Sequence, residues 1–297
     1  MEEKIMSTVY FTKETTPENV VKLFNLLNKD LPGKVACKVH SGEKGNQNFL
    51  HPEFWKPIIE HVNGVVVECN TAYEGQRNTS EKHLKLIEEH GWSKYFDIDL
   101  LDKEEPDLVL PVKNGLVIKD NYLGKNIDNY DSMLVLSHFK GHPSAGYGGA
   151  LKQLAIGCAS SRGKANIHSI GKTTSQHECW KTKPPQDKFL AAMAEAASTV
   201  TEYFQGNIAY INIMCNMSVD CDCCAVAEDP KIKDIGILAS LDPVAIDQAC
   251  IDLIYQCDDP GKKHLIERIE TRNGIHTIEV AAKLEIGKRE YQLIEVD

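Results

Sequence analysis

The stretch of residues 132–168 constrains the fold of this chain more than any other part of the sequence. Residues 133–137 form a short apolar run that ends at polar residues, a pattern typical of a buried strand. Small residues follow from 143 to 150, and apolar residues then recur at helical spacing, at positions 151, 154, 155 and 158. Open α/β sheets bind ligands at such strand-to-helix junctions, so this stretch predicts both a fold class and the place of a site.

The side chains and backbone of this stretch predict a site for an anion. Glycines let the backbone approach a ligand closely, and the start of a helix adds partial positive charge. Histidines suit proton exchange because they titrate near neutral pH. We predict proton exchange by His138 and His142, anchoring of an anion or cofactor by Lys152, and binding contacts from Gly146, Gly148, Gly149 and Lys140. Alternatively the loop is only a tight connection, since it has neither a GxGxxG nor a Walker A pattern.

Strands and helices alternate along the rest of the chain, which favours an α/β fold with a mainly parallel or mixed sheet flanked by helices. Apolar runs predict strands at residues 8–12, 34–39, 64–69, 208–214, 235–239 and 291–296. Caps and helical spacing predict helices at residues 16–28, 52–61, 80–90, 188–204, 243–255, 263–271 and 278–284. Residues 95–119 predict a small β excursion at the sheet edge, with a hairpin around 113–115. We expect one α/β unit over residues 1–297, or two lobes, 1–172 and 186–297, around a cleft.

Polar residues follow several of the predicted strands. The carboxyl ends of parallel strands meet at one edge of a sheet, so we expect one open side to collect the exits at His40, Asn70, His138, Cys215 and Ser240. A common cleft is then expected to hold His142, Lys152 and His168, with Cys221 or Cys223 at its rim. Glu43, in the polar segment after the second strand, is expected to contact the ligand or cofactor.

Composition excludes several classes of partner. The 297 residues carry a formal net charge of −10 and no long basic run, which argues against nucleic acid and acidic membranes as partners. The first residues are acidic and lack the apolar core of a signal peptide, and no apolar stretch reaches the roughly 20 residues that span a bilayer. We therefore expect a cytoplasmic protein that binds a small anionic molecule, with a homo-oligomer or a redox partner protein left open.

Ten cysteines in such a chain indicate metal or redox chemistry rather than disulfides. Cys221 and Cys223 are separated by one residue at the end of a predicted strand, where adjacent thiolates can share a soft metal or an iron–sulfur cluster. The spacing is not that of a ferredoxin, so a closed site needs ligands from elsewhere, such as Cys179, His177 or His168. Iron, zinc, nickel and an iron–sulfur cluster all remain open. The alternative is that these are buried thiols that pack as small hydrophobic groups.

Several long motifs together resemble one family. They are KVH with the following GE at residues 38–43, SHFKGH at 137–142, GYGGALKQLAIGCASSRGK at 146–164, SVDCDC at 218–223 and DIGILASLDPVAIDQAC at 234–250. The chain resembles the domain of unknown function three-six-two, whose members are often labelled uncharacterised Fe–S centre proteins. Longer members carry a ferredoxin-type insert about where residues 169–185 lie, and this chain has only Cys179 in that span.

One segment is also similar to the nickel-pincer lactate racemases. The matching positions are His142, Lys152 and His168, with the same separations. The resemblance implies acid–base work for His142, covalent attachment of the cofactor for Lys152 and nickel binding for His168. We therefore expect a metal- or cofactor-dependent enzyme, isomerase- or racemase-like or redox, that acts on a small anion. The alternative is a metal or iron–sulfur protein that transfers electrons without catalysis of its own.

Overall fold

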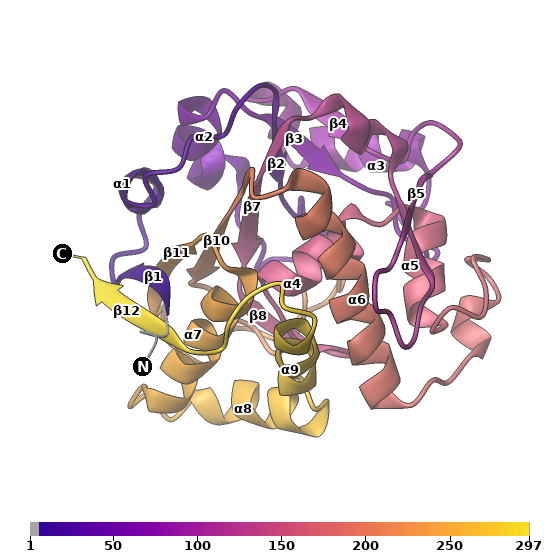
Figure 1. The fold of residues 1–297 in the computed structure, drawn as a ribbon. Helices are drawn as coiled ribbons and strands as arrows, with labels where there is room; N and C mark the ends of the chain where they lie inside the picture. Colours follow the sequence, from indigo (N-terminus) through magenta and orange to yellow (C-terminus); the bar gives the residue numbers. More distant parts are fainter. Residues whose placement is uncertain (1–5, 297) are drawn as a thin grey trace.

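The computed structural model describes residues 6–296 and is built around one twisted sheet (Figure 1). Its eight strands lie in the order β12-β1-β11-β10-β7-β2-β3-β4. Their bounds are β1 (Ser7–Thr12), β2 (Val35–Lys38), β3 (Val65–Glu68), β4 (Ile98–Leu100), β7 (Ser132–His138), β10 (Ile208–Met214), β11 (Gly236–Ser240) and β12 (Tyr291–Glu295). Two small antiparallel sheets pair β5 (Leu108–Pro111) with β6 (Asp120–Leu123) and β8 (Lys140–His142) with β9 (Gly146–Gly148).

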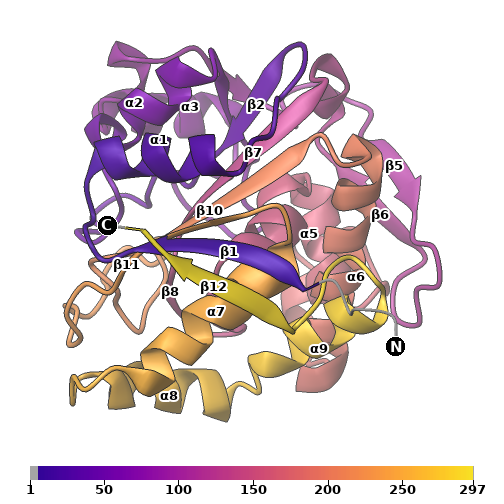
Figure 2. The same ribbon diagram turned by 60° about the vertical axis from the view of Figure 1, so that its left-hand side comes forward.

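Helices cover both faces of the sheet (Figure 2). One face carries α1 (Pro17–Leu26), α2 (Pro52–His61) and α3 (Ser80–Glu89). The other carries α4 (Ala150–Lys152), the π-helical segment η3 (Gln153–Gly157), α5 (Ser161–His168), α6 (Gln186–Phe204), α7 (Pro243–Gln256), α8 (Lys262–Thr271) and α9 (Ile275–Lys283). The short 3₁₀ turns are η1 (Trp92–Lys94), η2 (Lys125–Asn129) and η4 (Cys179–Lys181). This arrangement confirms the predicted α/β class.

The alternation of side chains along the central strands explains the two layers. In β7, Met133 and Val135 pack into the core beneath α6 and α7, whereas Leu134 and Leu136 pack into the core beneath α1 and α2. Successive side chains of a strand point to opposite faces, so a strand buried on both sides is apolar throughout. Residues 133–136 are all apolar for this reason.

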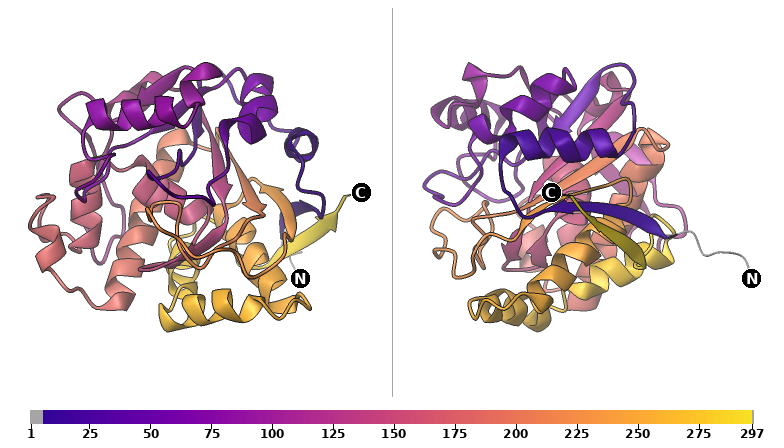
Figure 3. Two further views of the ribbon diagram at one scale, coloured as in Figure 1. Left: turned by 180° about the vertical axis from the view of Figure 1, so that it is seen from behind. Right: turned by 90° about the vertical axis from the view of Figure 1, so that its left-hand side faces the viewer.

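The direction of each strand determines at which edge of the sheet the residues after its carboxyl end lie. β4, β3, β2, β7 and β10 are all parallel, so their carboxyl ends lie at one edge of the sheet. β11 is antiparallel to both β10 and β1, and it therefore ends at the opposite edge. The expectation that Ser240 joins the other strand exits is wrong for this reason. Figure 3 shows the sheet from behind and from the side, with β1 and β12 at its rim.

The hairpin predicted around residues 113–115 is displaced. β5 pairs with β6 (Asp120–Leu123). Residues 116–118, which the predicted hairpin places in the second strand, instead bind a side chain of α6. The buried Glu195 carboxylate on α6 accepts the backbone N–H groups of Leu116, Val117 and Ile118. Separately, no helix within residues 6–296 is long and apolar enough to cross a lipid bilayer.

Candidate functional site

A cavity of about 210 Å³ opens at the carboxyl ends of β2 and β3, beside the helical segment that follows β9. Its polar and charged lining comprises Lys38, His40, Glu68, Thr71, Tyr73, Arg77, His142, Ser144, Lys152, Gln153, Lys164, His168 and Cys223. Trp180 and Phe189 also line it. The cavity thus brings together His142, Lys152 and His168, as the strand-end argument predicted, and Cys223 lies at it.

Positive charge dominates this cavity. The Nζ atoms of Lys38 and Lys164 donate to the backbone carbonyls of Val39 and Ala159 and form no ion pair with a described residue. No hydrogen bond or ion pair joins Lys152 Nζ to any residue within 6–296. Lys152 and Lys164 are therefore not neutralised by the chain itself, and buried charges of one sign favour a ligand of the other.

The remaining charged groups of the cavity are already paired. Arg77 Nε donates to Glu43 Oε2 at 3.1 Å, and both side chains are buried. The Glu68 carboxylate accepts from His83 Nε2 at 2.7 Å and from the backbone N–H of Ser41 at 2.7 Å. Burial opposes ionisation of Glu68, but the His83 hydrogen bond holds its pKa well below the usual range. Glu43 thus meets Arg77 rather than facing the cavity as a free ligand contact.

Hydrogen bonds from the backbone determine which ring nitrogen of His142 carries the proton. Its Nδ1 accepts the backbone N–H groups of Ser144 at 3.1 Å and Ala145 at 2.9 Å. Burial and the neighbouring Lys152 lower the pKa of His142 to about 4. The ring is therefore neutral with its proton on Nε2, which lies 3.9 Å from Cys223 Sγ. His142 thus offers a hydrogen-bond donor to its surroundings.

His168 is held differently. Its ring lies between the indole of Trp180 and the ring of Phe189, with centroids 4.8 and 5.0 Å away. Burial and the charges of Lys152 and Lys164 lower the pKa of His168 to about 4. No hydrogen bond to its ring nitrogens is present among the described residues. His168 therefore keeps an unused basic nitrogen beside the cavity.

This pKa shift predicts acid sensitivity. A histidine whose pKa falls from 6.5 to about 4 on folding destabilises the fold as the pH drops through that window, because the unfolded chain binds the proton first. For the partly exposed His168 we expect a loss of about 1–2 kcal/mol between pH 7 and 4.5. Urea unfolding of His168→Phe, which keeps the stacked ring, should show a smaller loss. The exposed His264→Phe serves as control, and identical pH dependence in wild type and His168→Phe would contradict the expectation.

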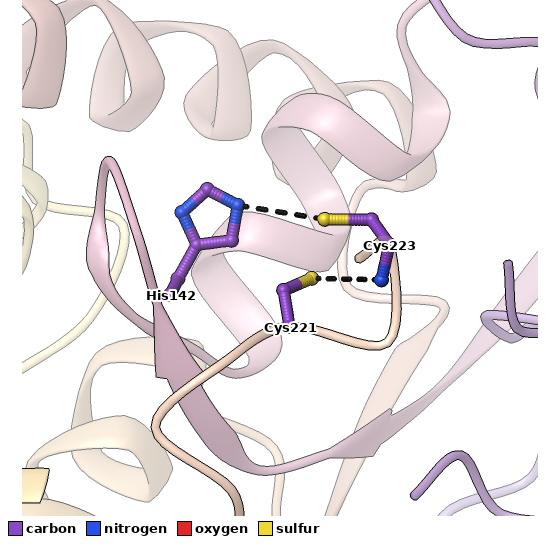
Figure 4. Close-up of side chains that lie close together, drawn as sticks. All are labelled: His142, Cys221 and Cys223. Carbon is purple, nitrogen blue, oxygen red and sulfur yellow. Dashed lines mark hydrogen bonds between the residues drawn. The ribbon is translucent and has the colours of Figure 1, made fainter. Parts of the chain in front are cut away.

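His142, Cys221 and Cys223 form a compact group, with ligand atoms all within 4.8 Å of one another (Figure 4). Cys221 and Cys223 belong to the segment after β10, whereas His142 ends β8. No other group of three or more such ligands occurs within residues 6–296. His168 and Cys179, which were predicted to complete a site with the two cysteines, therefore lie outside this group. Cys179 is buried in η4, where its thiol donates to the Gln176 carbonyl. A four-cysteine cluster therefore has no ligand set here.

His138 and Lys140 lie outside the cavity lining, and both bind Asp222. The Asp222 carboxylate contacts His138 Nδ1 at 3.0 Å and Lys140 Nζ at 2.8 Å, and all three side chains are buried. His138 Nε2 also donates to the Cys215 carbonyl at 2.8 Å. Both ring nitrogens of His138 thus face groups of the chain itself, so neither is open to a ligand. This corrects the expectations that His138 exchanges protons and that Lys140 binds the cofactor.

The start of α4 is also occupied by the chain itself. Asp247 of α7, fully buried, accepts the backbone N–H groups of Ala150 at 2.8 Å and Leu151 at 3.0 Å. A Cβ atom on Gly149 would lie 2.4 Å from Asp247 Oδ1, so this glycine makes room for the carboxylate. The anion expected at this helix start is therefore Asp247. Gly146, Gly148 and Gly149 do not line the cavity, which corrects their expected role in ligand binding.

Sequence reasoning missed Lys164 and the structural role of Asp222. Lys164 belongs to the quoted run ending in SSRGK, and Asp222 lies between the two cysteines that drew attention to the segment. Lys38 was noted only as part of the KVH motif at residues 38–40, near the end of the predicted strand 34–39. A charged residue at the buried end of an apolar strand, as in VACK, is the signal that marks Lys38.

Comparisons with known proteins match this chain to one family model and to solved structures. The model of the family described as domain of unknown function (DUF362) matches residues 35–252. The lactate racemase apoprotein from Thermoanaerobacterium thermosaccharolyticum is similar in structure, with a TM-score of 0.46 and 12% identity over 83% of this chain and 57% of that chain. A crystal structure of a Thermotoga maritima protein gives a TM-score of 0.39 and 10% identity over 90% of this chain and 59% of that chain.

At these values neither solved structure bears on the activity of this chain, which spans 57% and 59% of their lengths. Among curated proteins, no sequence matches significantly.

Proposed function

We propose that this chain, which belongs to the DUF362 family, is a metal- or cofactor-dependent enzyme that performs acid–base chemistry on a small carboxylate bound in the cationic cavity. The observation that carries the proposal is the pair Lys152 and Lys164, which line the cavity without a carboxylate partner among the described residues. A cavity of about 210 Å³ suits a small ligand rather than a nucleotide.

Within this proposal the two histidines have different tasks. His142 donates its Nε2–H to an oxygen of the substrate, because its Nδ1 is held by two backbone N–H groups. His168 accepts a proton, because its ring nitrogens have no partner within residues 6–296. Lys152 and Lys164 hold the carboxylate. Proton transfer requires a donor and an acceptor that face the same ligand, and the presence of both histidines in the cavity lining supports this assignment.

The residues that the racemase resemblance assigns to a cofactor fit such a group. Lys152 and His168 both line the cavity, and neither side chain is used by a hydrogen bond within the described chain. A cofactor held by these two residues would supply an electron sink to the reaction. With Lys152 and His168 engaged by that group, Lys164 would bind the carboxylate and His142 would donate its proton to it.

Carboxylate binding tests the proposal. Titration calorimetry with propionate and malonate should detect binding to the wild-type chain, and Lys164→Met should weaken it about tenfold, equivalent to about 1.4 kcal/mol, because one buried positive charge is lost. Lys152→Met should behave similarly. The exposed Lys172→Met is the matched control and should bind like wild type. Absence of carboxylate binding by the wild-type chain, or equal affinity in all three variants, would overturn the proposal.

Metal binding without catalysis is a second candidate function, favoured by the proximity of His142, Cys221 and Cys223. Three such ligands leave one position of a tetrahedral metal open. Two features weigh against it. Burial raises the pKa of Cys221 to about 11, and His142 accepts hydrogen bonds at Nδ1, whereas metal-bound imidazoles ordinarily donate there.

Metal analysis of the wild-type chain and its cysteine variants tests the second candidate. If the second is correct, protein purified without oxygen should contain about one iron, zinc or nickel per chain, and Cys221→Ser and Cys223→Ser should lose it. Cys257→Ser, which removes a cysteine at the end of α7, is the control and should retain the metal. Metal-free protein that binds carboxylates would exclude the second candidate.

A further inference from the structure

Two lysines of this chain are buried in opposite electrostatic settings. Lys140 contacts the Asp222 carboxylate at 2.8 Å, and this neighbour keeps its pKa above the usual value despite burial. Lys38, at the end of β2, is more deeply buried and has only the Val39 carbonyl as a hydrogen-bond partner within the described residues. An ammonium group has three protons to donate, so Lys38 is poorly satisfied as a cation.

The surroundings of Lys38 favour its neutral amine. Burial lowers the pKa of Lys38, and the positive charge of Lys164 acts in the same direction. The Glu68 charge opposes the shift, but that carboxylate is engaged by His83 and Ser41. A neutral lysine amine has a lone pair and is a nucleophile.

Lys38 also lies where its amine reaches a ligand in the cavity. The side chain lines the cavity together with Lys152, Lys164 and His168. It passes directly beneath Gly157 of η3, where an added Cβ would lie 2.8 Å from Lys38 Cε and 3.3 Å from Nζ. The absence of a side chain at Gly157 therefore leaves room for the amine at the cavity wall.

We propose that Lys38 is a nucleophile of this cavity and forms an imine with a small carboxylate that carries a ketone or aldehyde group. The proposal rests on the cavity binding carboxylates, and it adds the substrate class and the attacking atom. The Lys38 Nζ lone pair attacks the carbonyl carbon to give a carbinolamine. Loss of the carbonyl oxygen as water then forms the C=N bond, with no oxidant or reductant required.

The other cavity groups suit this chemistry. Lys152 and Lys164 hold the carboxylate, and His142 offers an Nε2–H donor for the carbonyl oxygen as it leaves. The protonated imine withdraws electrons from the neighbouring carbon, and His168 has an unused nitrogen to accept a proton from it. Lys38 thereby supplies an electron sink made from the chain itself.

Reductive trapping tests this inference on the full-length chain. The protein is incubated with pyruvate and sodium borohydride, and intact mass spectrometry followed by peptide mapping locates the adduct. We expect one secondary-amine adduct per chain, on Lys38. Lys38→Met should reduce labelling at least tenfold, and the exposed Lys172→Met should label like wild type. Peptide mapping of the wild-type chain decides the site even if Lys38→Met fails to fold.

Calorimetry with propionate, which has the carboxylate but no carbonyl, distinguishes failure of this inference from failure of the proposed function. Propionate binding without a pyruvate adduct overturns the imine and leaves the carboxylate site intact. An adduct on Lys152 or Lys164 instead of Lys38 also overturns the inference. Absence of both binding and labelling overturns the two proposals together.

Discussion

Replacing Asp222 by alanine is expected to lower the free energy of unfolding by about 3–5 kcal/mol. Asp222 is buried and contacts both His138 and Lys140 at 3.0 and 2.8 Å. The substitution leaves these two side chains buried without their carboxylate, and an uncompensated buried charge is among the costliest changes in a protein interior. Urea unfolding followed by circular dichroism measures the change.

The Asp222 variant also tests the position of the two neighbouring thiols. Asp222 ties the segment between Cys221 and Cys223 to β7 and β8, so its loss should increase the rate at which a thiol reagent labels Cys221, which is buried in wild type. Asp229→Ala removes an exposed carboxylate from the same segment and should change stability by less than about 0.5 kcal/mol. Stability of Asp222→Ala equal to that of Asp229→Ala would show that the buried pairs contribute nothing.

A second large loss, about 3–4 kcal/mol, is expected for Asp247→Ala. Its carboxylate accepts the N–H groups of Ala150 and Leu151, Asn212 Nδ2 at 2.8 Å and the Tyr147 hydroxyl at 3.2 Å. The substitution leaves all four donors without an acceptor in a region closed to water. Each unsatisfied buried donor costs about 1–3 kcal/mol, and the four costs are not fully additive.

Replacement of Asp247 should also change ligand binding in the cavity. Asp247 holds the first residues of α4, which also carries Lys152, so its loss should weaken carboxylate binding as well as stability. Asp258→Ala, at an exposed position just after α7, is the control and should leave both quantities unchanged within about 0.5 kcal/mol. A stable Asp247→Ala with wild-type affinity would contradict the anchoring role.

Much of the fold follows from local patterns in the sequence. The strand at residues 208–214 and the helix at 52–61 lie where they were predicted, because an apolar run buried on both faces and a proline-started amphipathic helix each depend on neighbouring residues. The meeting of His142, Lys152 and His168 at one cavity also follows, since all three belong to one strand–loop–helix unit.

Tertiary structure decided which polar groups are free to meet a ligand. His138 and Asp222 are 84 residues apart in sequence, and Ala150 and Asp247 are 97 apart, so no local pattern shows that these partners satisfy each other. The direction of β11 was likewise undetermined, because an apolar run fits a parallel or an antiparallel neighbour equally well. Local pattern determines which residues follow a strand, whereas long-range packing determines which of them the protein uses itself and which it leaves to a ligand.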